Sequence, residues 1–280
     1  MDAMPIHVAG VFLFAVSILM LYFRLRPLAG EVIPVAGCAV MLFLGAAAAD
    51  LLWTFQIGFF GSAAAGMGAL LTLRVGRRTT DLLGCSLLVV SILFSSLALP
   101  ILAGAAVQLA CRGESERRTV RSRLVSDSWI VLVPILIFFG WWLGWGHEAA
   151  NSLSAGNVVR LPLYLLSAIG YSAGALTGLF TLKELTLSYL WAVPGLAVVI
   201  GLAALLRSRD KVPPEFLVAT TCGLTFWLLA GLGFEPGREF WASRYQYPGA
   251  LFLLMTLGGA LTDIHLSRRI NWFAGLVAAF

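Results

Sequence analysis

The chain has 280 residues, of which 60% are hydrophobic and 12% are charged, so its charged share is about half that of an ordinary soluble domain. A water-soluble core cannot absorb so much apolar surface, whereas a bilayer can if the backbone closes its own hydrogen bonds in helices. The composition therefore excludes an ordinary soluble enzyme. It predicts an all-α fold, a polytopic transmembrane helical bundle that forms a single integral membrane domain over 1–280.

Apolar runs follow one another along almost the whole chain. A membrane span needs about 20 residues of helix, and fewer in a short hairpin. We expect about nine or ten spans, near 6–23, 32–50, 55–73, 81–97, 99–111, 128–146, 187–206, 215–233, 248–264 and from 271 onward.

Two segments do not fit the simple pattern. The stretch 81–111 is too long for one span and short for two, and Ser95, Ser96 and Pro100 interrupt it. Because a proline disfavours helix in the residue before it, we expect a tight turn here and a short helical hairpin. The second segment, 160–181, is apolar but contains tyrosines and begins near an arginine. We expect it to lie along or partly within the outer interface.

Basic residues indicate how the chain is oriented. All but four of the 19 Lys and Arg residues fall in five loops, 24–31, 74–80, 112–127, 207–214 and 265–270. The positive-inside rule places these loops in the cytoplasm, so the N-terminus is expected outside a cell's inner (plasma) membrane. This assignment requires the hairpin at 81–111 and an even number of crossings by 160–181. The bias also accounts for the isoelectric point of 9.3 without a nucleic-acid partner.

The two ends of the chain favour a fragment of a larger membrane protein. The last apolar run stops ten residues after it begins at Asn271, which is about half of what a span needs. The charge count puts the start of the chain outside. Both observations are expected of a chain that begins within a larger architecture.

Polar side chains gather in four clusters on the predicted outer face. They are the segment 50–56, the turn at 147–148 with two nearby asparagines, the segment 160–171, and the segment 235–248. Their members are Asp50, Trp53 and Gln56; His147 and Glu148; Arg160, Tyr164 and Tyr171; and Glu235, Arg238, Glu239, Arg244, Tyr245 and Tyr247.

Each cluster also has a structural interpretation. Asp50 can cap a helix, since an acid at a helix N-terminus is favourable, and His147 and Glu148 can be plain loop residues. Arg244 lies on the face that is poor in arginine, between two tyrosines. It can form a salt bridge with Glu235 or Glu239. Alternatively it can bind an anion, because its planar fork fits phosphate oxygens and tyrosines add hydroxyl donors.

The sequence offers little support for other classes of function. No pair of opposite charges is evident within an apolar run, which argues against an ion-coupled transporter. The sequence contains no nucleotide-binding P-loop, no zinc-ligand spacing and no serine-hydrolase or zinc-protease motif.

Four stretches together support a resemblance to a known family. They are 51–71, the hairpin around 95–106, the segment 141–148, and 242–250 with its Arg-Tyr-Gln-Tyr-Pro run. They resemble a group of bacterial polytopic membrane proteins that are similar to the GT-C glycosyltransferases, the class of the protein O-mannosyltransferases and the aminoarabinose transferases. The resemblance covers most of 30–265.

The resemblance implies lipid-linked sugar transfer at the outer membrane face, with a polyprenyl-phosphate-linked sugar as donor. It leaves a divalent metal open and names no certain cofactor. The chain departs from the family in one respect: no first span with an acidic outer loop precedes 6–23. A non-catalytic membrane protein that binds a lipid or a partner is therefore an alternative, and a small-molecule transporter is a second one. The implied catalytic residues are Asp50, His147 and Glu148, and the implied substrate-binding residues are Arg244, Tyr245, Tyr247, Arg238, Gln56, Trp53 and Arg160.

Overall fold

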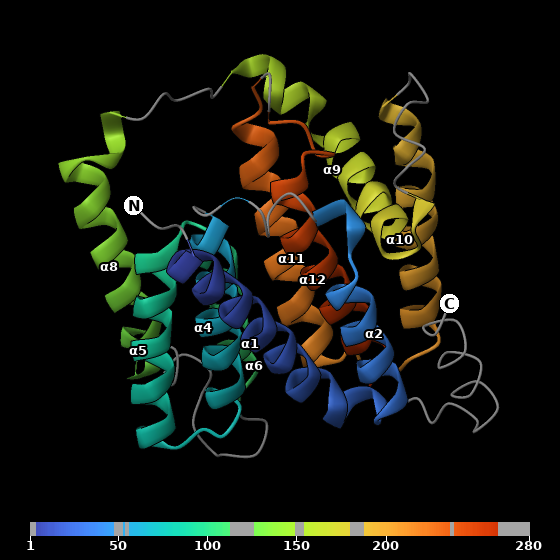
Figure 1. Ribbon diagram of the computed structural model, residues 1–280. Coiled ribbons are helices and arrows are strands. Elements are labelled where there is room, and N and C mark those ends of the chain that lie inside the picture. Colours follow the sequence, from blue (N-terminus) through green and yellow to red (C-terminus); the bar gives the residue numbers. More distant parts are fainter. Residues whose placement is uncertain are drawn as a thin grey trace.

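A computed structural model describes residues 4–47, 53, 56–112, 126–148, 154–179, 188–235 and 238–262. These residues form helices and turns, with no strand among them, which confirms the all-α prediction. The described part contains ten α-helices of 11 to 26 residues (Figure 1). They are α1 (Met4–Ala29), α2 (Val32–Leu42), α4 (Ile57–Thr72), α5 (Arg78–Phe94), α6 (Ala98–Cys111), α8 (Trp129–Gly144), α9 (Ala155–Leu176), α10 (Ala192–Arg207), α11 (Pro214–Leu232) and α12 (Ser243–Ala260).

Length and composition support a membrane protein. Four helical stretches within the described ranges are long and apolar enough to cross a membrane, namely Met4–Ala29, Ala155–Leu176, Tyr189–Arg207 and Pro214–Leu232. Shorter apolar helices of 10–17 residues accompany them. The number of nine or ten spans stays a prediction, since a short helix crosses only with help from its neighbours.

The basic segments gather at one end of the bundle. We call this the basic end and define it by Arg24, Arg74, Arg112 and Glu215, which belong to the end of α1, the turns after α4 and α6, and the start of α11. Ion pairs join Glu215 to both Arg24 and Arg74. The end of α10 lies close to the start of α11, because Leu206 and Phe216 line one cavity between these helices. The structure thus brings the described parts of the predicted cytoplasmic loops together.

The predicted hairpin at 81–111 is confirmed. Helix α5 ends at Phe94 and α6 begins at Ala98. Between them Ser95 adopts an extended backbone, and its hydroxyl accepts a hydrogen bond from Leu97 N at 3.0 Å. Pro100 lies in the first turn of α6, where a missing N–H leaves no helix hydrogen bond unmade.

Helix α9 is steeply inclined to its neighbours. Near the start of α9, Asn157 donates to the Leu232 carbonyl at the end of α11. Near the end of α9, Ser172 lies close to Gly249 of α12, and Trp227 of α11 is close to the same glycine. This stretch of α9 is about 22 Å long, but the contacted positions on α11 span only about 8 Å. The middle of α9 then packs against the first turns of α10, because Gly170 faces the Trp191 carbonyl. How many times the segment 160–181 crosses the membrane stays a prediction, and Ala155–Leu176 is long and apolar enough to cross.

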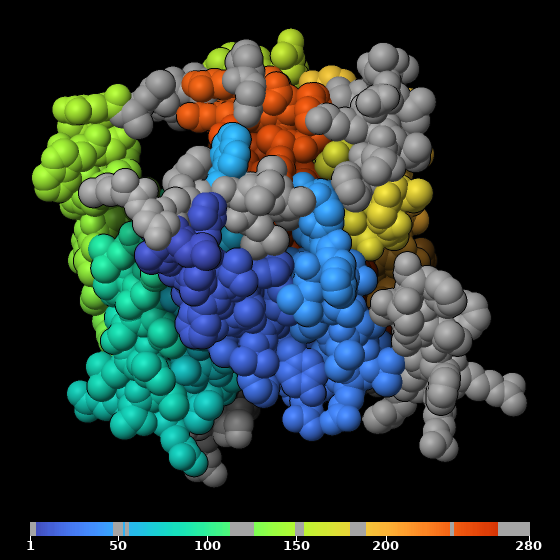
Figure 2. Space-filling model, in the orientation of Figure 1, coloured from blue at the N-terminus to red at the C-terminus, as the bar shows by residue number. Residues whose placement is uncertain are grey.

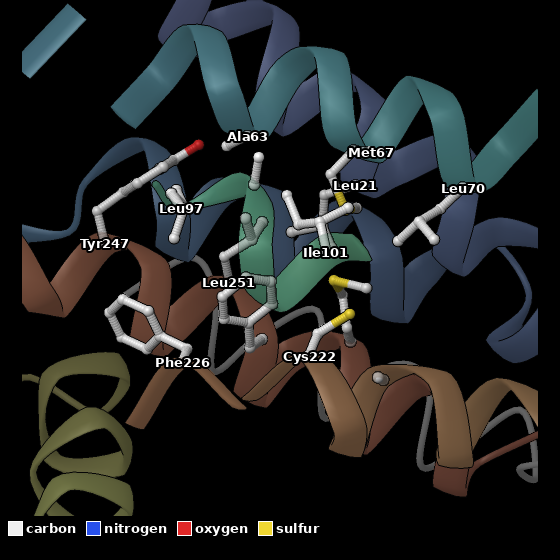
Figure 3. Close-up of a cluster of buried hydrophobic side chains, with 14 of the residues drawn as sticks. Leu21, Ala63, Met67, Leu70, Leu97, Ile101, Cys222, Phe226, Tyr247 and Leu251 are labelled. Atoms are coloured by element: carbon white, nitrogen blue, oxygen red, sulfur yellow. The ribbon is translucent and has the colours of Figure 1, made fainter. Parts of the chain in front are cut away.

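Small residues allow the core helices to approach closely. Helices α1, α4, α6 and α12 each contribute a fully buried side chain to the core (Figure 3). These are Leu21, Met67, Ile101 and Leu251. A Cβ atom on Gly104 of α6 would lie 2.2 Å from the sulfur of Cys222, so only glycine fits there. Helices α1 and α2 cover the near face of this core (Figure 2). Close packing through small residues is typical of helices in lipid.

Candidate functional site

Arg244 lies in the first turn of α12, at the end of the bundle opposite the basic end. Its guanidinium carbon is 5.1 Å from the centroid of the Tyr245 ring, a cation–π distance. The Tyr245 ring in turn packs against Phe226 and Trp227 of α11, with centroids 6.1 and 6.3 Å apart. No side chain caps the N-terminus of α12. A cationic side chain and an uncapped helix start, whose partial charge is positive, therefore lie side by side.

Tyr164 extends from α9 into the same region. Its side chain is 5% exposed and its ring meets those of Trp227, Phe234 and Phe240 edge-on, at 6.4, 5.9 and 5.7 Å. Among the described residues its hydroxyl has no hydrogen-bond partner. A buried polar group without a partner costs about 1–3 kcal/mol. This hydroxyl is therefore suited to receive a polar group from a ligand.

Trp227 connects Tyr164 to the pair formed by Arg244 and Tyr245. The ring of Trp227 lies 6.4 Å from that of Tyr164 and 6.3 Å from that of Tyr245, and Arg244 lies over the Tyr245 ring. Arg244 and Tyr245 come from the first turn of α12, whereas Tyr164 comes from α9. We call Tyr164, Arg244 and Tyr245 the tyrosine–arginine site.

The segment that carries Glu239 is anchored at both ends. The Asn157 amide donates to the carbonyls of Leu232 and Phe234 at 3.0 and 3.1 Å. Phe240 is 1% exposed, and its backbone carbonyl accepts a hydrogen bond from the Gln246 amide. These contacts fix the turn against α9 and α12, so the position of Glu239 is set by packing.

An apolar cavity of about 300 Å³ adjoins the tyrosine–arginine site. Helices α9, α10, α11 and α12 form its wall, and Trp227 belongs both to the wall and to the aromatic support of Tyr164 and Tyr245. The cavity extends from this tryptophan towards the basic end. Its side chains are almost all apolar, and they include Val198, Leu202, Leu206, Phe216, Trp227 and Phe252.

Arg238 and Arg160 flank this site in different ways. Arg238 Nε is 3.6 Å from Glu235 Oε2, so Glu235 pairs with Arg238. Arg160 is exposed and lies one turn before Tyr164 on α9. It borders a small pocket with Tyr164 and Tyr189.

Tyr247 is a core residue, contrary to its expected role in substrate binding. It is 0% exposed and its hydroxyl is hydrogen-bonded to Ser17. Its ring meets those of Phe14 and Phe60 at 5.5 and 5.0 Å, and Figure 3 shows it reaching from α12 across the core. Successive residues of a helix point about 100° apart, so Tyr245 and Tyr247 face different neighbours.

The expected residues of segment 50–56 are only partly described. Asp50 lies outside the described residues. Trp53 is 56% exposed, whereas Gln56 is 1% exposed, and the Gln56 amide atoms have no hydrogen-bond partner in the part of the chain that is described. Gln56 lies one turn before Phe60, which contacts Tyr247. It therefore belongs to the same end of the bundle as Arg244.

The structure places His147 and Glu148 away from the tyrosine–arginine site. Both are exposed in a short 3₁₀ helix, Gly146–Glu148, that follows α8, and His147 Nδ1 is 3.2 Å from the Trp142 carbonyl. Helix α8 packs against α5 and α6, on the side of the bundle opposite α9 and α10 (Figure 1). Over the described ranges, no three acidic, histidine or cysteine side chains are arranged to hold a metal ion.

Buried opposite charges occur at the basic end, where they lie at the ends of the apolar runs and not within them. Arg24 Nη2 is 2.6 Å from Glu215 Oε2, and Arg74 Nε is 2.8 Å from Glu215 Oε1. Gln108 and Arg24 both donate to the Leu70 carbonyl, at 2.8 and 3.3 Å. The network connects α1, α4, α6 and α11 at the basic end. Both carboxylate oxygens of Glu215 already face guanidinium groups, so the network holds these helices together.

The sequence pattern indicates Arg244 and Tyr245 but assigns no binding role to Tyr164, which it groups with Arg160. The spacing of Tyr164 four residues after Arg160 was an available signal, since such residues share one face of a helix. Comparisons of this chain with protein-family models, with curated proteins and with solved structures found no match.

Proposed function

We propose that this chain is a plasma-membrane protein that binds a long-chain lipid phosphate and transfers a sugar from it, as a GT-C-like glycosyltransferase does. The observation that carries the proposal is the position of Trp227, which connects an apolar cavity to a site that contains an arginine and a buried tyrosine hydroxyl. A polyprenyl phosphate has this same division between an apolar chain and an anionic head.

The head group is recognised by Arg244. A guanidinium presents two parallel N–H groups to phosphate oxygens, and the Tyr164 hydroxyl supplies a further donor that the protein itself leaves without a partner among the described residues. A hydrogen bond to a charged group contributes about 1.5–3 kcal/mol. The uncapped start of α12 adds a favourable dipole.

The chain of the lipid occupies the cavity between α10 and α11. Within a bilayer the chain is already out of water, so van der Waals contact with the cavity wall favours a chain whose shape fits it. The positive-inside rule puts the basic end in the cytoplasm. The tyrosine–arginine site then faces the outer leaflet and the N-terminus lies outside.

Binding without catalysis is the second candidate, and the position of α8 favours it. The two described residues that are expected to be catalytic, His147 and Glu148, follow α8, which packs against α5 and α6. Arg244 belongs to α12, which packs against α9 and α11. A protein that holds a lipid phosphate needs only the tyrosine–arginine site and the cavity.

Native mass spectrometry of the purified chain, with decaprenyl phosphate and decaprenol as probes, tests the binding. We expect the phosphate to be retained more strongly than the alcohol, and Arg244→Ala to reduce its retention about tenfold or more. Arg244→Lys should weaken retention less, since the charge remains while the fork is lost. Leu202→Trp, which fills the cavity, should reduce the retention of both probes.

Two variants serve as matched controls. Arg209→Ala removes an arginine at the basic end, and Leu136→Trp enlarges a side chain on α8 that is already 65% exposed. Neither should change retention. Equal retention of decaprenyl phosphate by the wild type and by Arg244→Ala would refute the assignment of the head-group site.

A further inference from the structure

The apolar cavity opens at the surface of the bundle between α10 and α11. Its lining includes Val199 of α10 and Leu224 of α11, which are 41% and 42% exposed. Phe252 of α12 also lines it and is 1% exposed. The cavity therefore has a buried floor on α12 and an exposed rim on α10 and α11. Both helices of the rim belong to stretches that are long and apolar enough to cross a membrane, so we expect the rim to face lipid chains.

Helix α10 is held by α9 and not by α11. A Cβ atom on Gly195 of α10 would collide with the Leu166 carbonyl oxygen of α9, so the two backbones approach closely. The main packing partner of α10 is α9. A short turn at 208–213 connects α10 to α11, yet side chains of both helices, such as Leu202 and Leu224, line the cavity between them. This separation leaves a lateral opening.

The cavity is smaller than a long polyprenyl chain requires. Its lining on α11 extends from Phe216 to Trp227, which is about 16 Å along the helix and about half of the hydrocarbon thickness of a bilayer. Its volume of about 300 Å³ is at the lower limit of pockets that enclose a drug-sized ligand. The cavity can therefore hold only the part of a decaprenyl chain that follows the phosphate.

We propose that the opening between α10 and α11 is a lateral portal through which a polyprenyl phosphate enters the cavity from the bilayer, an inference that rests on the proposed function. The head group passes to the end of the cavity at Trp227, which contacts Tyr164 and Tyr245. The isoprene units nearest to the phosphate fill the cavity. The remaining units pass between Val199 and Leu224 and stay among the lipid tails.

The portal predicts that recognition does not depend on the full length of the chain. Lipid tails are as apolar as the surface of a membrane helix. Isoprene units outside the cavity meet such tails whether or not the phosphate is bound, so they do not change the free energy of binding. The substrate class is therefore polyprenyl phosphates that are longer than the cavity, without selection among their lengths.

The first measurement compares two chain lengths. The purified protein in mixed micelles is offered geranylgeranyl phosphate or decaprenyl phosphate at equal mole fractions, and retention is measured by native mass spectrometry. We expect equal retention of the two lipids, and the same relative loss of both in Arg244→Ala. Clearly stronger retention of decaprenyl phosphate would overturn the inference, because the distal units would then also be bound by the protein.

The second measurement closes the portal reversibly. Val199 and Leu224 are about 12 and 15 Å from the turn that connects α10 to α11, so they lie at a similar height on the rim. In the double variant Val199→Cys with Leu224→Cys, bifunctional methanethiosulfonate reagents of increasing length join the two positions. Joining them before decaprenyl phosphate is added should prevent loading, and reduction should restore it. Joining them after loading should hold the lipid against removal by lipid-free micelles.

Two kinds of control accompany the cross-link. Each single-cysteine variant, treated in the same way, controls for the four cysteines of the wild type. Leu224→Trp should slow loading without any cross-link, because it narrows the opening. Leu229→Trp is its matched control, since Leu229 is also on α11 and is 46% exposed but does not line the cavity. Equally fast loading of Leu224→Trp and Leu229→Trp would contradict the portal.

The outcomes separate the portal from the proposed function. If the wild type retains decaprenyl phosphate through Arg244, but the double variant loads equally well with its rim joined and with its rim free, the head-group site stands and the lipid enters elsewhere. If the wild type retains decaprenyl phosphate no better than decaprenol, the proposed function is refuted and the portal with it.

Discussion

Glu215→Gln should loosen the basic end of the bundle more than any exposed charge change. Glu215 contacts two guanidinium groups, one with each carboxylate oxygen, at 2.6 and 2.8 Å. The Arg24 side chain is 2% exposed and that of Glu215 20% exposed. The pair also joins helix ends of favourable polarity, since Arg24 lies near the end of α1 and Glu215 in the first turn of α11.

The expected size follows from burial. Removing one partner of a buried ion pair costs about 3–5 kcal/mol, because the remaining charge is left without a partner. Glu215 is one-fifth exposed, so water screens part of this effect and we expect about 3 kcal/mol. Glutamine in its place also leaves Arg24 and Arg74 as neighbouring like charges.

The surface pair formed by Arg26 and Glu31 is a matched control. Its separation is also 2.6 Å, but its side chains are 51% and 68% exposed. Solvent screens such a pair, so Glu31→Gln should leave the unfolding midpoint almost unchanged. The two substitutions therefore remove the same chemical group at the same distance and differ in burial.

The free energy of unfolding is measured by SDS titration of the purified chain in mixed micelles, with far-UV circular dichroism as the signal. The double variant Arg24→Met with Glu215→Leu should be less destabilised than the sum of its single changes, because apolar replacement of a buried pair is often nearly neutral. Equal shifts for Glu215→Gln and Glu31→Gln would refute the argument that burial sets the strength of the network.

Two further predictions concern packing and topology. Gly170→Ala should destabilise the contact between α9 and α10 by about 1–3 kcal/mol, because its Cβ would lie 1.9 Å from the Trp191 carbonyl oxygen. Gly201→Ala on α10 is the control, since open space surrounds that glycine. Equal thermal melts for the two variants would contradict the close contact. A cysteine at Ala155 should react with a membrane-impermeant maleimide in intact cells and one at Ser208 only after permeabilisation; the reverse pattern would invert the proposed topology.

Much of the fold could be predicted from the sequence because it depends on which residues follow one another along the chain. The break between α5 and α6 follows from Ser95, Ser96 and Pro100, which act on the local backbone. The grouping of the basic loops follows from the alternation of apolar runs and charges. Arg244 could be singled out for the same reason, since an arginine on a face poor in basic residues is visible in the sequence.

The composition of the site could be predicted only in part. The sequence placed His147, Asp50 and Arg244 at one membrane depth, but depth fixes a single coordinate and leaves the position within the membrane plane open. Helix α8 carries His147 beside α5 and α6, whereas α9, which carries Tyr164, packs against α12. Likewise Tyr245 and Tyr247 look equivalent in the sequence, and the rotation of α12 alone sends one towards Trp227 and the other into the core.

The sequence by itself determined that the chain is helical and suited to a membrane, how its runs are delimited, and which segments carry positive charge. Each of these properties depends on composition and on neighbours along the chain. Only the tertiary structure decided the steep inclination of α9 and the pairing of Arg24 with a glutamate 191 residues away. It also decided that Trp227 lines the cavity and contacts both Tyr164 and Tyr245. Apolar helices offer one another similar surfaces, so small residues and a few polar contacts decide which of them become neighbours.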